Sequence, residues 1–198
     1  EVGFRNRQAD EGVGSDELGF QIGQGADAVV VLFVAVGLLV ADEGDEEAEF
    51  GDLDGDGAAE IVTGPKAGGG PQIRVFDGTG RVDHTVGFYA FDESYHGGVN
   101  VAVGDVDGDG KGDIIVGSGE EMEPTVKVFS ASGVAKLIDF YPFAADNTGG
   151  VSVAVGNVDK DPAAEIITAV QQDGDAWVKI YDYNAQRTIV KEFKVLGD

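Results

Sequence analysis

The sequence contains no cysteine, only two histidines, and 13 lysine and arginine residues against 37 aspartate and glutamate residues. The absence of cysteine excludes disulfide bonds, thiolate catalysis and cysteine-ligated zinc or iron–sulfur sites. The net charge of −24 leaves too few cations for a basic patch, so we expect no binding to nucleic acid or to anionic membrane surfaces. Glycine is abundant, at 32 of 198 residues, and occurs among short runs of valine, isoleucine and phenylalanine. This composition predicts an all-β fold with many turns.

Long hydrophobic runs are also scarce. Residues 28–41 (AVVVLFVAVGLLVA) form a run shorter than the roughly 20 residues of a membrane-spanning helix, and Gly37 interrupts it. Acidic residues precede the run, where a signal peptide carries positive charge. We therefore expect no membrane span and interpret the run as an apolar β-strand, either buried in its own fold or docked on another subunit.

A repeat organises the rest of the chain. The segments FGDLDGDGAAEIVTG, VGDVDGDGKGDIIVG and VGNVDKDPAAEIITA begin at Phe50, Val103 and Val155, which are 53 and 52 residues apart. Each is followed by an alternating strand and an aromatic strand, and the first two units continue into strands such as VNVAVG. Four short strands in a repeat of this length are typical of a β-propeller blade.

The predicted fold class is therefore all-β, with repeated four-stranded antiparallel blades like those of a β-propeller. We expect residues 50–198 to form three repeats, at about 50–102, 103–154 and 155–198. Residues 1–49 fit the period poorly and are interpreted as a tether and a degenerate partial repeat that carries the apolar strand. The sequence leaves open whether the repeats close into a ring or form an open array.

The acidic loop of each repeat has the spacing of a calcium ligand set. Calcium prefers six to eight oxygen ligands. A tight loop can supply side chains from positions 1, 3 and 5 and the carbonyl of position 7, while an acid at position 9 closes the set from the following strand. The predicted ligands are Asp52, Asp54, Asp56, the Ala58 carbonyl and Glu60; Asp105, Asp107, Asp109, the Lys111 carbonyl and Asp113; and Asn157, Asp159, Asp161, the Ala163 carbonyl and Glu165.

The three loops are not equal. In the third loop, Asn157 replaces an acid, Lys160 brings a positive charge and Pro162 replaces the turn glycine, so we expect weaker calcium binding there. A helical EF-hand is excluded, because position 12 of the first loop is Thr63 and both flanks are strand-like. The alternative interpretation, solvated acidic turns, is disfavoured because two complete loops recur at the same phase of the repeat.

The acidic loops, the strands of IVTG and IIVG type that follow them, and the VFDG and VAVGD segments resemble the FG-GAP repeats (VCBS, integrin α-like) of calcium-binding β-propellers. The resemblance covers about residues 48–198. It implies a blade fold with calcium in the hairpin loop. It also implies an extracellular or cell-surface protein that acts in adhesion or recognition.

The sequence shows no catalytic constellation and no organic cofactor site, so we expect a non-enzymatic protein in adhesion or surface assembly. One alternative is a calcium-dependent carbohydrate-binding module, in which Tyr89 and Tyr141 offer stacking surfaces. Another is a polysaccharide-active enzyme such as a lyase. Expected partners are a glycan or surface protein, or further copies of the chain. Residues 28–41 would pair with the last repeat, closing a ring within one chain or building a head-to-tail filament between chains.

Overall fold

The computed structural model describes residues 18–21, 31–34, 46–77, 82–136, 139–159, 161–172 and 175–196. These residues form strands, turns and bends and no helix, which confirms the predicted all-β class. Consequently, no helix in the described ranges is long and apolar enough to cross a bilayer. The chain divides into two units, Glu1–Asp42 and Glu43–Asp198.

The first unit contains an antiparallel hairpin of β1 (Leu18–Gln21) and β2 (Val31–Val34), in which Leu18 lies opposite Val34. The strand predicted for residues 28–41 is observed only as β2, and residues 28–30 and 35–41 lie outside the described residues. Among the described strands, β2 pairs with β1 rather than with the last repeat. The pairing of residues 28–41 with the last repeat, and the ring or filament that it would build, stays a prediction.

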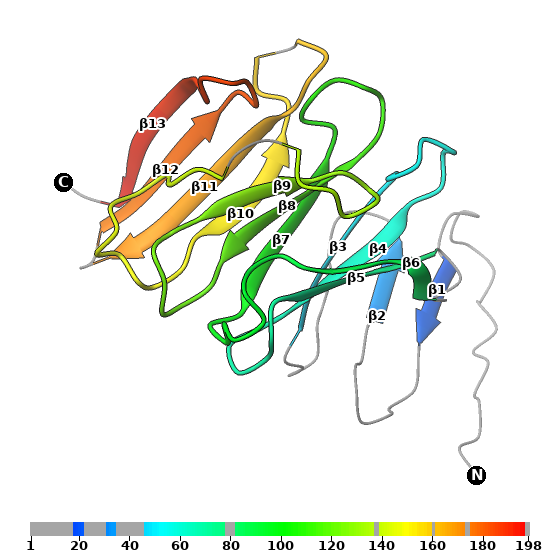
Figure 1. Ribbon diagram of the computed structural model, residues 1–198. Helices are drawn as coiled ribbons and strands as arrows, with labels where there is room; N and C mark the ends of the chain where they lie inside the picture. Colours follow the sequence, from blue (N-terminus) through cyan, green and yellow to red (C-terminus); the bar gives the residue numbers. More distant parts are fainter. Residues whose placement is uncertain are drawn as a thin grey trace, which may run out of the picture. The chain divides into compact units, whose positions relative to one another are not determined.

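Three antiparallel sheets follow one another in the second unit (Figure 1). The first sheet consists of β3 (Glu46–Gly51), β4 (Glu60–Pro65), β5 (Gln72–Phe76) and β6 (Val82–Tyr89). The second consists of β7 (Val99–Gly104), β8 (Asp113–Ser118) and β9 (Val126–Phe129). The third consists of β10 (Ser152–Gly156), β11 (Glu165–Gln172), β12 (Asp175–Tyr181) and β13 (Ile189–Leu196).

The second sheet has no regular fourth strand, although the sequence predicted one. Two isolated bridges, Val126 with Phe140 and Phe129 with Ala135, take its place. One residue fewer separates Phe129 from Phe140 than separates Phe76 from Phe88 in the first repeat. The corresponding pairs of the first sheet, Ile73 with Phe88 and Phe76 with Val82, lie within regular strands, so the second sheet keeps the same two contacts as isolated bridges.

The sheets are out of phase with the predicted repeat boundaries by one strand. Gly104 pairs with Asp113, so the acidic loop is the hairpin connection between β7 and β8. The strand VNVAVG therefore belongs to the sheet that follows it, whereas the repeat 50–102 grouped it with the preceding strands. For the same reason, the predicted boundary between residues 49 and 50 falls inside β3, which pairs with β4.

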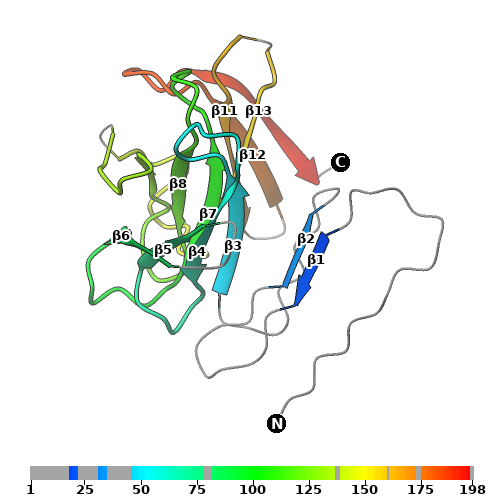
Figure 2. The ribbon, with the colours of Figure 1, turned by 90° about the vertical axis from the view of Figure 1, so that its right-hand side faces the viewer.

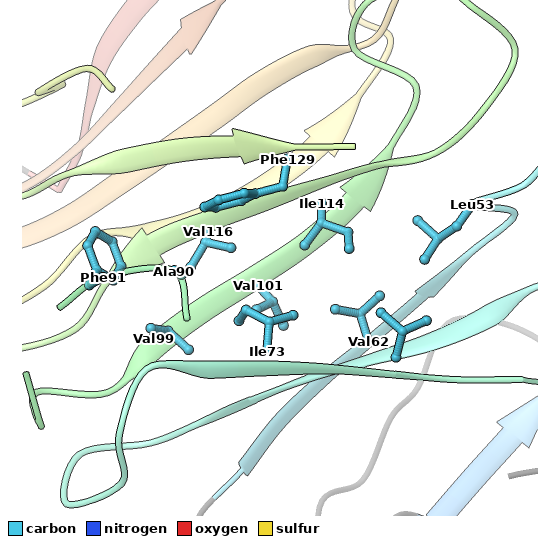
Figure 3. Close-up of a cluster of buried hydrophobic side chains, with 11 residues drawn as sticks. Leu53, Val62, Ile73, Ala90, Phe91, Val99, Val101, Ile114, Val116 and Phe129 are labelled. Carbon is cyan, nitrogen blue, oxygen red and sulfur yellow. The ribbon is translucent and has the colours of Figure 1, made fainter. Parts of the chain in front are cut away.

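Two hydrophobic clusters join the sheets. In the first cluster, Val62 and Ile73 of the first sheet pack with Val101, Ile114 and other residues of the second (Figure 3). The second cluster joins the opposite face of the second sheet to the third. The first strands of the sheets are neighbours: β3 lies beside β7 in both views (Figure 2), and β7 contacts β10. This stacking places the three acidic loops at one edge of the unit.

Candidate metal centres

The first loop, residues 52–60, connects β3 to β4 and folds around the Asp52 carboxylate. Asp52 Oδ1 accepts hydrogen bonds from the backbone N–H groups of Gly55 and Asp56, at 2.7 and 3.1 Å. Its Oδ2 accepts one from Gly57 at 2.9 Å. Gly57 has a φ of 89°, which side chains other than glycine rarely adopt. Position 6 is therefore a glycine because the backbone must turn sharply beneath the carboxylate.

The second loop, residues 105–113, repeats this arrangement. Asp105 accepts backbone hydrogen bonds from Gly108 at 2.7 Å, Asp109 at 3.0 Å and Gly110 at 2.8 Å. Gly110 takes the same role as Gly57, with a φ of 84°. Two loops that are similar in sequence thus have the same hydrogen-bonded fold.

The acid at position 9 is the first residue of the next strand and reaches back under its loop. Its carboxylate accepts a hydrogen bond from the backbone N–H of position 2. The pairs are Glu60 with Leu53 at 2.9 Å, Asp113 with Val106 at 3.2 Å and Glu165 with Val158 at 2.6 Å. Leu53 and Val106 are buried in the hydrophobic clusters, so the core fixes the positions of Glu60 and Asp113.

Each loop gathers three carboxylates whose oxygens all lie within 4.8 Å of one another. The groups are Asp52, Asp54 and Glu60; Asp105, Asp107 and Asp113; and Asp159, Asp161 and Glu165. Nine of the predicted side-chain ligands are thereby brought together. The remaining residues of the predicted ligand sets lie outside these groups: Asp56, Ala58, Asp109, Lys111, Asn157 and Ala163.

The donor sets fit a hard divalent cation. They consist of carboxylate oxygens, which calcium prefers, and three like charges at this separation repel each other unless a cation is present. The pKa of the Glu60 carboxyl shows the effect of burial and of the neighbouring charges. Burial raises the pKa of its carboxyl, the charges of Asp54, Asp56 and Asp52 raise it further, and the hydrogen bond from Leu53 lowers it. A calcium ion in the first loop would be held by Asp52, Asp54 and Glu60.

The second loop contains a feature that the sequence analysis missed. Lys136 Nζ lies 2.6 Å from Asp107 Oδ2 and 3.9 Å from Asp109 Oδ2, and it also forms an ion pair with Asp113. Burial lowers the pKa of the Lys136 ammonium, but its hydrogen bonds to Asp107 and Asp113 and their charges outweigh burial and raise it. Because Lys136 is 29 residues from Asp107 in the chain, loop spacing gives no signal for this contact.

The Asp113 carboxyl is the most deeply buried of these acids, with 1% of its surface exposed. Burial raises its pKa above the usual range, and the contact with Lys136 offsets only part of this effect. A buried carboxylate without a counter-ion is strongly unfavourable, so the second loop requires a cation near Asp113.

In the third loop, the side-chain amide of Asn157 donates hydrogen bonds within the loop itself. Asn157 Nδ2 donates a hydrogen bond to the carbonyl of Ala163 at 3.3 Å and another to the carbonyl of Asp161. The carbonyl predicted to bind metal at position 7 therefore already has a donor. Lys160, which was expected to weaken the site, lies outside the described residues.

Backbone hydrogen bonds connect neighbouring loops. Gly112 N–H donates to the Asp52 carbonyl at 2.7 Å, and Ala164 N–H donates to the Asp105 carbonyl at 2.8 Å. In each case the residue before the position 9 acid contacts position 1 of the preceding loop. The three carboxylate groups thus belong to one connected edge.

The comparisons with known proteins concern the segment that holds the first two loops. A family model described as an FG-GAP-like repeat matches residues 52–116. This segment carries an FG-GAP-like repeat. The resemblance inferred from the sequence is confirmed for this part of the chain. The comparison with curated protein sequences gives no match.

Two solved structures have a similar fold. One is the Bacillus licheniformis rhamnogalacturonan lyase PL11, with a TM-score of 0.56 and 15% identity over 75% of this chain and 34% of that one. The other is the exotype rhamnogalacturonan lyase YesX, with a TM-score of 0.53 and 14% identity over 90% of this chain and 37% of that one. The chain thus spans about a third of the length of these enzymes, and at this identity the likeness shows the fold alone.

Proposed function

We propose that this chain is a non-enzymatic, calcium-binding β-repeat module. The observation that carries the proposal is the recurrence of three oxygen-only carboxylate groups, one at the first hairpin of each sheet. Calcium would bind carboxylate groups that only the folded loops bring together, and a ligand that binds only the folded state stabilises it. Calcium would therefore stabilise the edge that holds the three loops, where the net charge of the chain, −24, opposes folding.

Thermal unfolding tests this proposal. We expect the melting temperature to rise in calcium relative to EDTA, and Asp54→Ala to remove a larger share of this rise than Asp161→Ala. At a calcium concentration about 100 times the Kd, one lost site corresponds to about 2.7 kcal/mol. Asp92→Ala is a matched control, because Asp92 is an exposed acid that hydrogen-bonds Ser94 away from the loops. Equal melting temperatures in calcium and EDTA would refute the proposal.

We also propose an extracellular or cell-surface setting in which the module acts in adhesion or surface assembly. Short, exposed oxygen loops suit the calcium concentrations of extracellular modules, which bind with Kd values of about 0.1 to 1 mM. The titratable groups with displaced pKa in the loops, Glu60, Asp113 and Lys136, contact backbone or one another, which supports a structural role for them.

Self-association is part of this proposal. The last strand, β13, exposes four apolar side chains: Ile189 at 47%, Val190 at 39%, Phe193 at 41% and Val195 at 54%. Exposed apolar side chains on one strand are typical of a surface that meets another protein. A second copy of the chain, contributing its apolar segment 28–41, would extend or cover this strand in a head-to-tail assembly.

Carbohydrate binding is the second candidate function, and a cavity favours it. The cavity has a volume of about 700 Å³ and lies at the ends of β3, β7 and β10 opposite the acidic loops. Its lining includes Glu47, Lys66, Asn100 and Ser152. These polar groups suit a ligand with hydroxyl groups, and both similar folds are parts of enzymes named for a polysaccharide.

A glycan array probed with and without EDTA tests this second function. Sugar binding that is lost on chelation, and that Lys66→Ala weakens, would favour the carbohydrate-binding module. An assay for cleavage of rhamnogalacturonan would reveal an enzyme instead. Binding to no glycan would leave the calcium-stabilised adhesion module as the better account.

A further inference from the structure

The backbone of Lys136 is held firmly next to the second loop. It follows the turn after β9, in which Gly133 N–H donates to Ser130 and Ser130 N–H donates to Val134. Lys136 N–H then donates to the Val128 carbonyl at 2.9 Å, which ties the residue to the second sheet. The lysine side chain therefore extends from a fixed point rather than from a free loop.

The Lys136 ammonium lies among the same oxygens that the second loop would offer to calcium. Its Nζ contacts Asp107 and Asp113, which are two of the three carboxylates in the group of that loop. Only 19% of the Lys136 side chain is exposed, so the contact is shielded from water and salt. The buried Asp113 carboxylate thus has a cation that belongs to the protein itself.

The first loop differs in this respect. Among the residues that the structure describes, no lysine or arginine forms an ion pair with Asp52, Asp54 or Glu60. The first and second loops share the positions of their carboxylates and the backbone hydrogen bonds to position 1, but they differ at position 7 (Ala58 and Lys111), at position 9 (Glu60 and Asp113) and in the contact of the second loop with Lys136. The effect of Lys136 is therefore isolated by comparing the second loop with and without this side chain.

We propose that Lys136 is a tethered cation that neutralises the second loop without metal, and that calcium enters this loop only by displacing it. This inference rests on the calcium binding proposed above. It follows that the first loop fills at lower calcium concentrations than the second. It also follows that the second loop keeps its fold when calcium is absent, because Asp113 retains a partner.

The test measures calcium binding to the second loop alone. Asp54→Asn and Asp159→Asn disable the first and third loops in the full-length chain. Calcium is then titrated by calorimetry against this protein with Lys136 present and with Lys136→Met. Lys127→Met is the matched control, because Lys127 lies on the same sheet but pairs with Asp139 at 3.2 Å, outside the loops.

Hydrogen bonds between charged groups are strong enough that removing this competitor should lower the calcium Kd about tenfold or more. Lys127→Met should leave the Kd within about twofold of its starting value. In EDTA, Lys136→Met should lower the melting temperature more than Lys127→Met, because it leaves Asp113 buried without a counter-ion. If Lys136→Met does not fold, Lys136→Gln removes the charge and keeps a hydrogen-bond donor.

Two outcomes separate this inference from the proposed function. If the unmodified chain binds calcium but Lys136→Met or Lys136→Gln leaves the Kd of the second loop unchanged or raises it, the tethered-cation inference alone is wrong. If the unmodified chain binds no calcium, the proposed function fails, and the inference fails with it.

Discussion

Asp52 and Asp105 each have two roles. Each carboxylate accepts three backbone hydrogen bonds that shape its loop, and each supplies an oxygen to a carboxylate group. Because the backbone donors already hold these carboxylates in place, the loop is organised before a cation arrives. Preorganisation of this kind lowers the entropy that binding must remove.

Glu47 lies near the start of β3, at the end of the strand away from the first acidic loop, and its carboxylate has fewer hydrogen-bond donors than that of Asp52. Its Oε2 atom is buried and has no hydrogen-bond partner among the described residues. Burial raises the pKa of the Glu47 carboxyl, the charge of Lys66 lowers it, the charge of Glu49 raises it, and a backbone hydrogen bond from Val101 lowers it. Glu47 also lines the cavity, and burial there disfavours the charged form of its carboxyl.

The raised pKa makes stability depend on pH. A carboxyl whose pKa is higher in the folded state binds more protons when folded, so its contribution favours folding at low pH and is lost as pH rises above its usual value of 4.5. We expect Glu47→Gln to raise stability by about 1 kcal/mol at pH 7.5 and to have little effect at pH 4. Urea unfolding at the two pH values, with exposed Glu120→Gln as the control, measures this difference. A loss of stability at pH 7.5 would contradict the prediction.

Close contact between strands holds neighbouring sheets together. Gly51 is the last residue of β3, and a Cβ atom built on it would lie 2.5 Å from Val103 Cγ1 of the second sheet. Gly156 occupies the same position in the third repeat, where the nearest atom to such a Cβ would be Ile167 Cδ1 at 3.8 Å. The glycine at this position therefore allows close packing of the sheets at Gly51, whereas a methyl group would fit at Gly156.

A pair of substitutions tests this packing. Gly51→Ala should lower the free energy of unfolding by about 1 to 3 kcal/mol, because the added methyl group forces the first and second sheets apart. Gly156→Ala should change it by less than about 0.5 kcal/mol. Guanidinium unfolding of both variants gives the comparison. Equal losses would show that the clash at Gly51 does not control sheet packing.

The sequence predicted the loops better than it predicted the sheets. Alternate acids and a glycine at position 6 are local features, and both loops with that pattern fold as expected. Strand grouping depends on pairing across the loops, and the repeat boundaries predicted from the sequence lie one strand away from the boundaries of the sheets. The segment AEFG in β3 is equivalent to VAVG in β7, but the two do not look alike in the sequence. The strand β3 contains Glu46, Glu47 and Glu49, and a strand rich in acids does not resemble an apolar one.

Lys136 could not be predicted for a different reason. Its contact with the second loop depends on the irregular turn after β9, and no spacing rule relates that turn to the loop. The Asn157 amide was expected to weaken the third loop because it lacks a charge. The structure adds that it donates to the Ala163 carbonyl, which a sequence pattern cannot show.

The third sheet ends the stack with an apolar face. In the second sheet, Ile115 and Val128 pack against the third sheet, and the corresponding face of the third sheet includes Ile167, Val178 and Phe193. Phe193 is 41% exposed. A face of this kind favours association with a further sheet.

Sedimentation velocity of the full-length chain measures this association. We expect species larger than a monomer in calcium at high protein concentration, and Phe193→Glu to reduce the association constant by about tenfold or more. Gln186→Glu adds the same charge in the turn before β13 and should have little effect. A chain that stays monomeric in calcium at high concentration would contradict the assembly proposal.

The backbone bonds from Gly112 to Asp52 and from Ala164 to Asp105 make the loops one connected edge of the molecule. The central claim is that this edge binds calcium, and calorimetric titration of the full-length chain with calcium tests it most directly. The account predicts a saturable heat with the first loop as the tightest site, and loss of that site in Asp54→Ala. No heat of binding at millimolar calcium would contradict it.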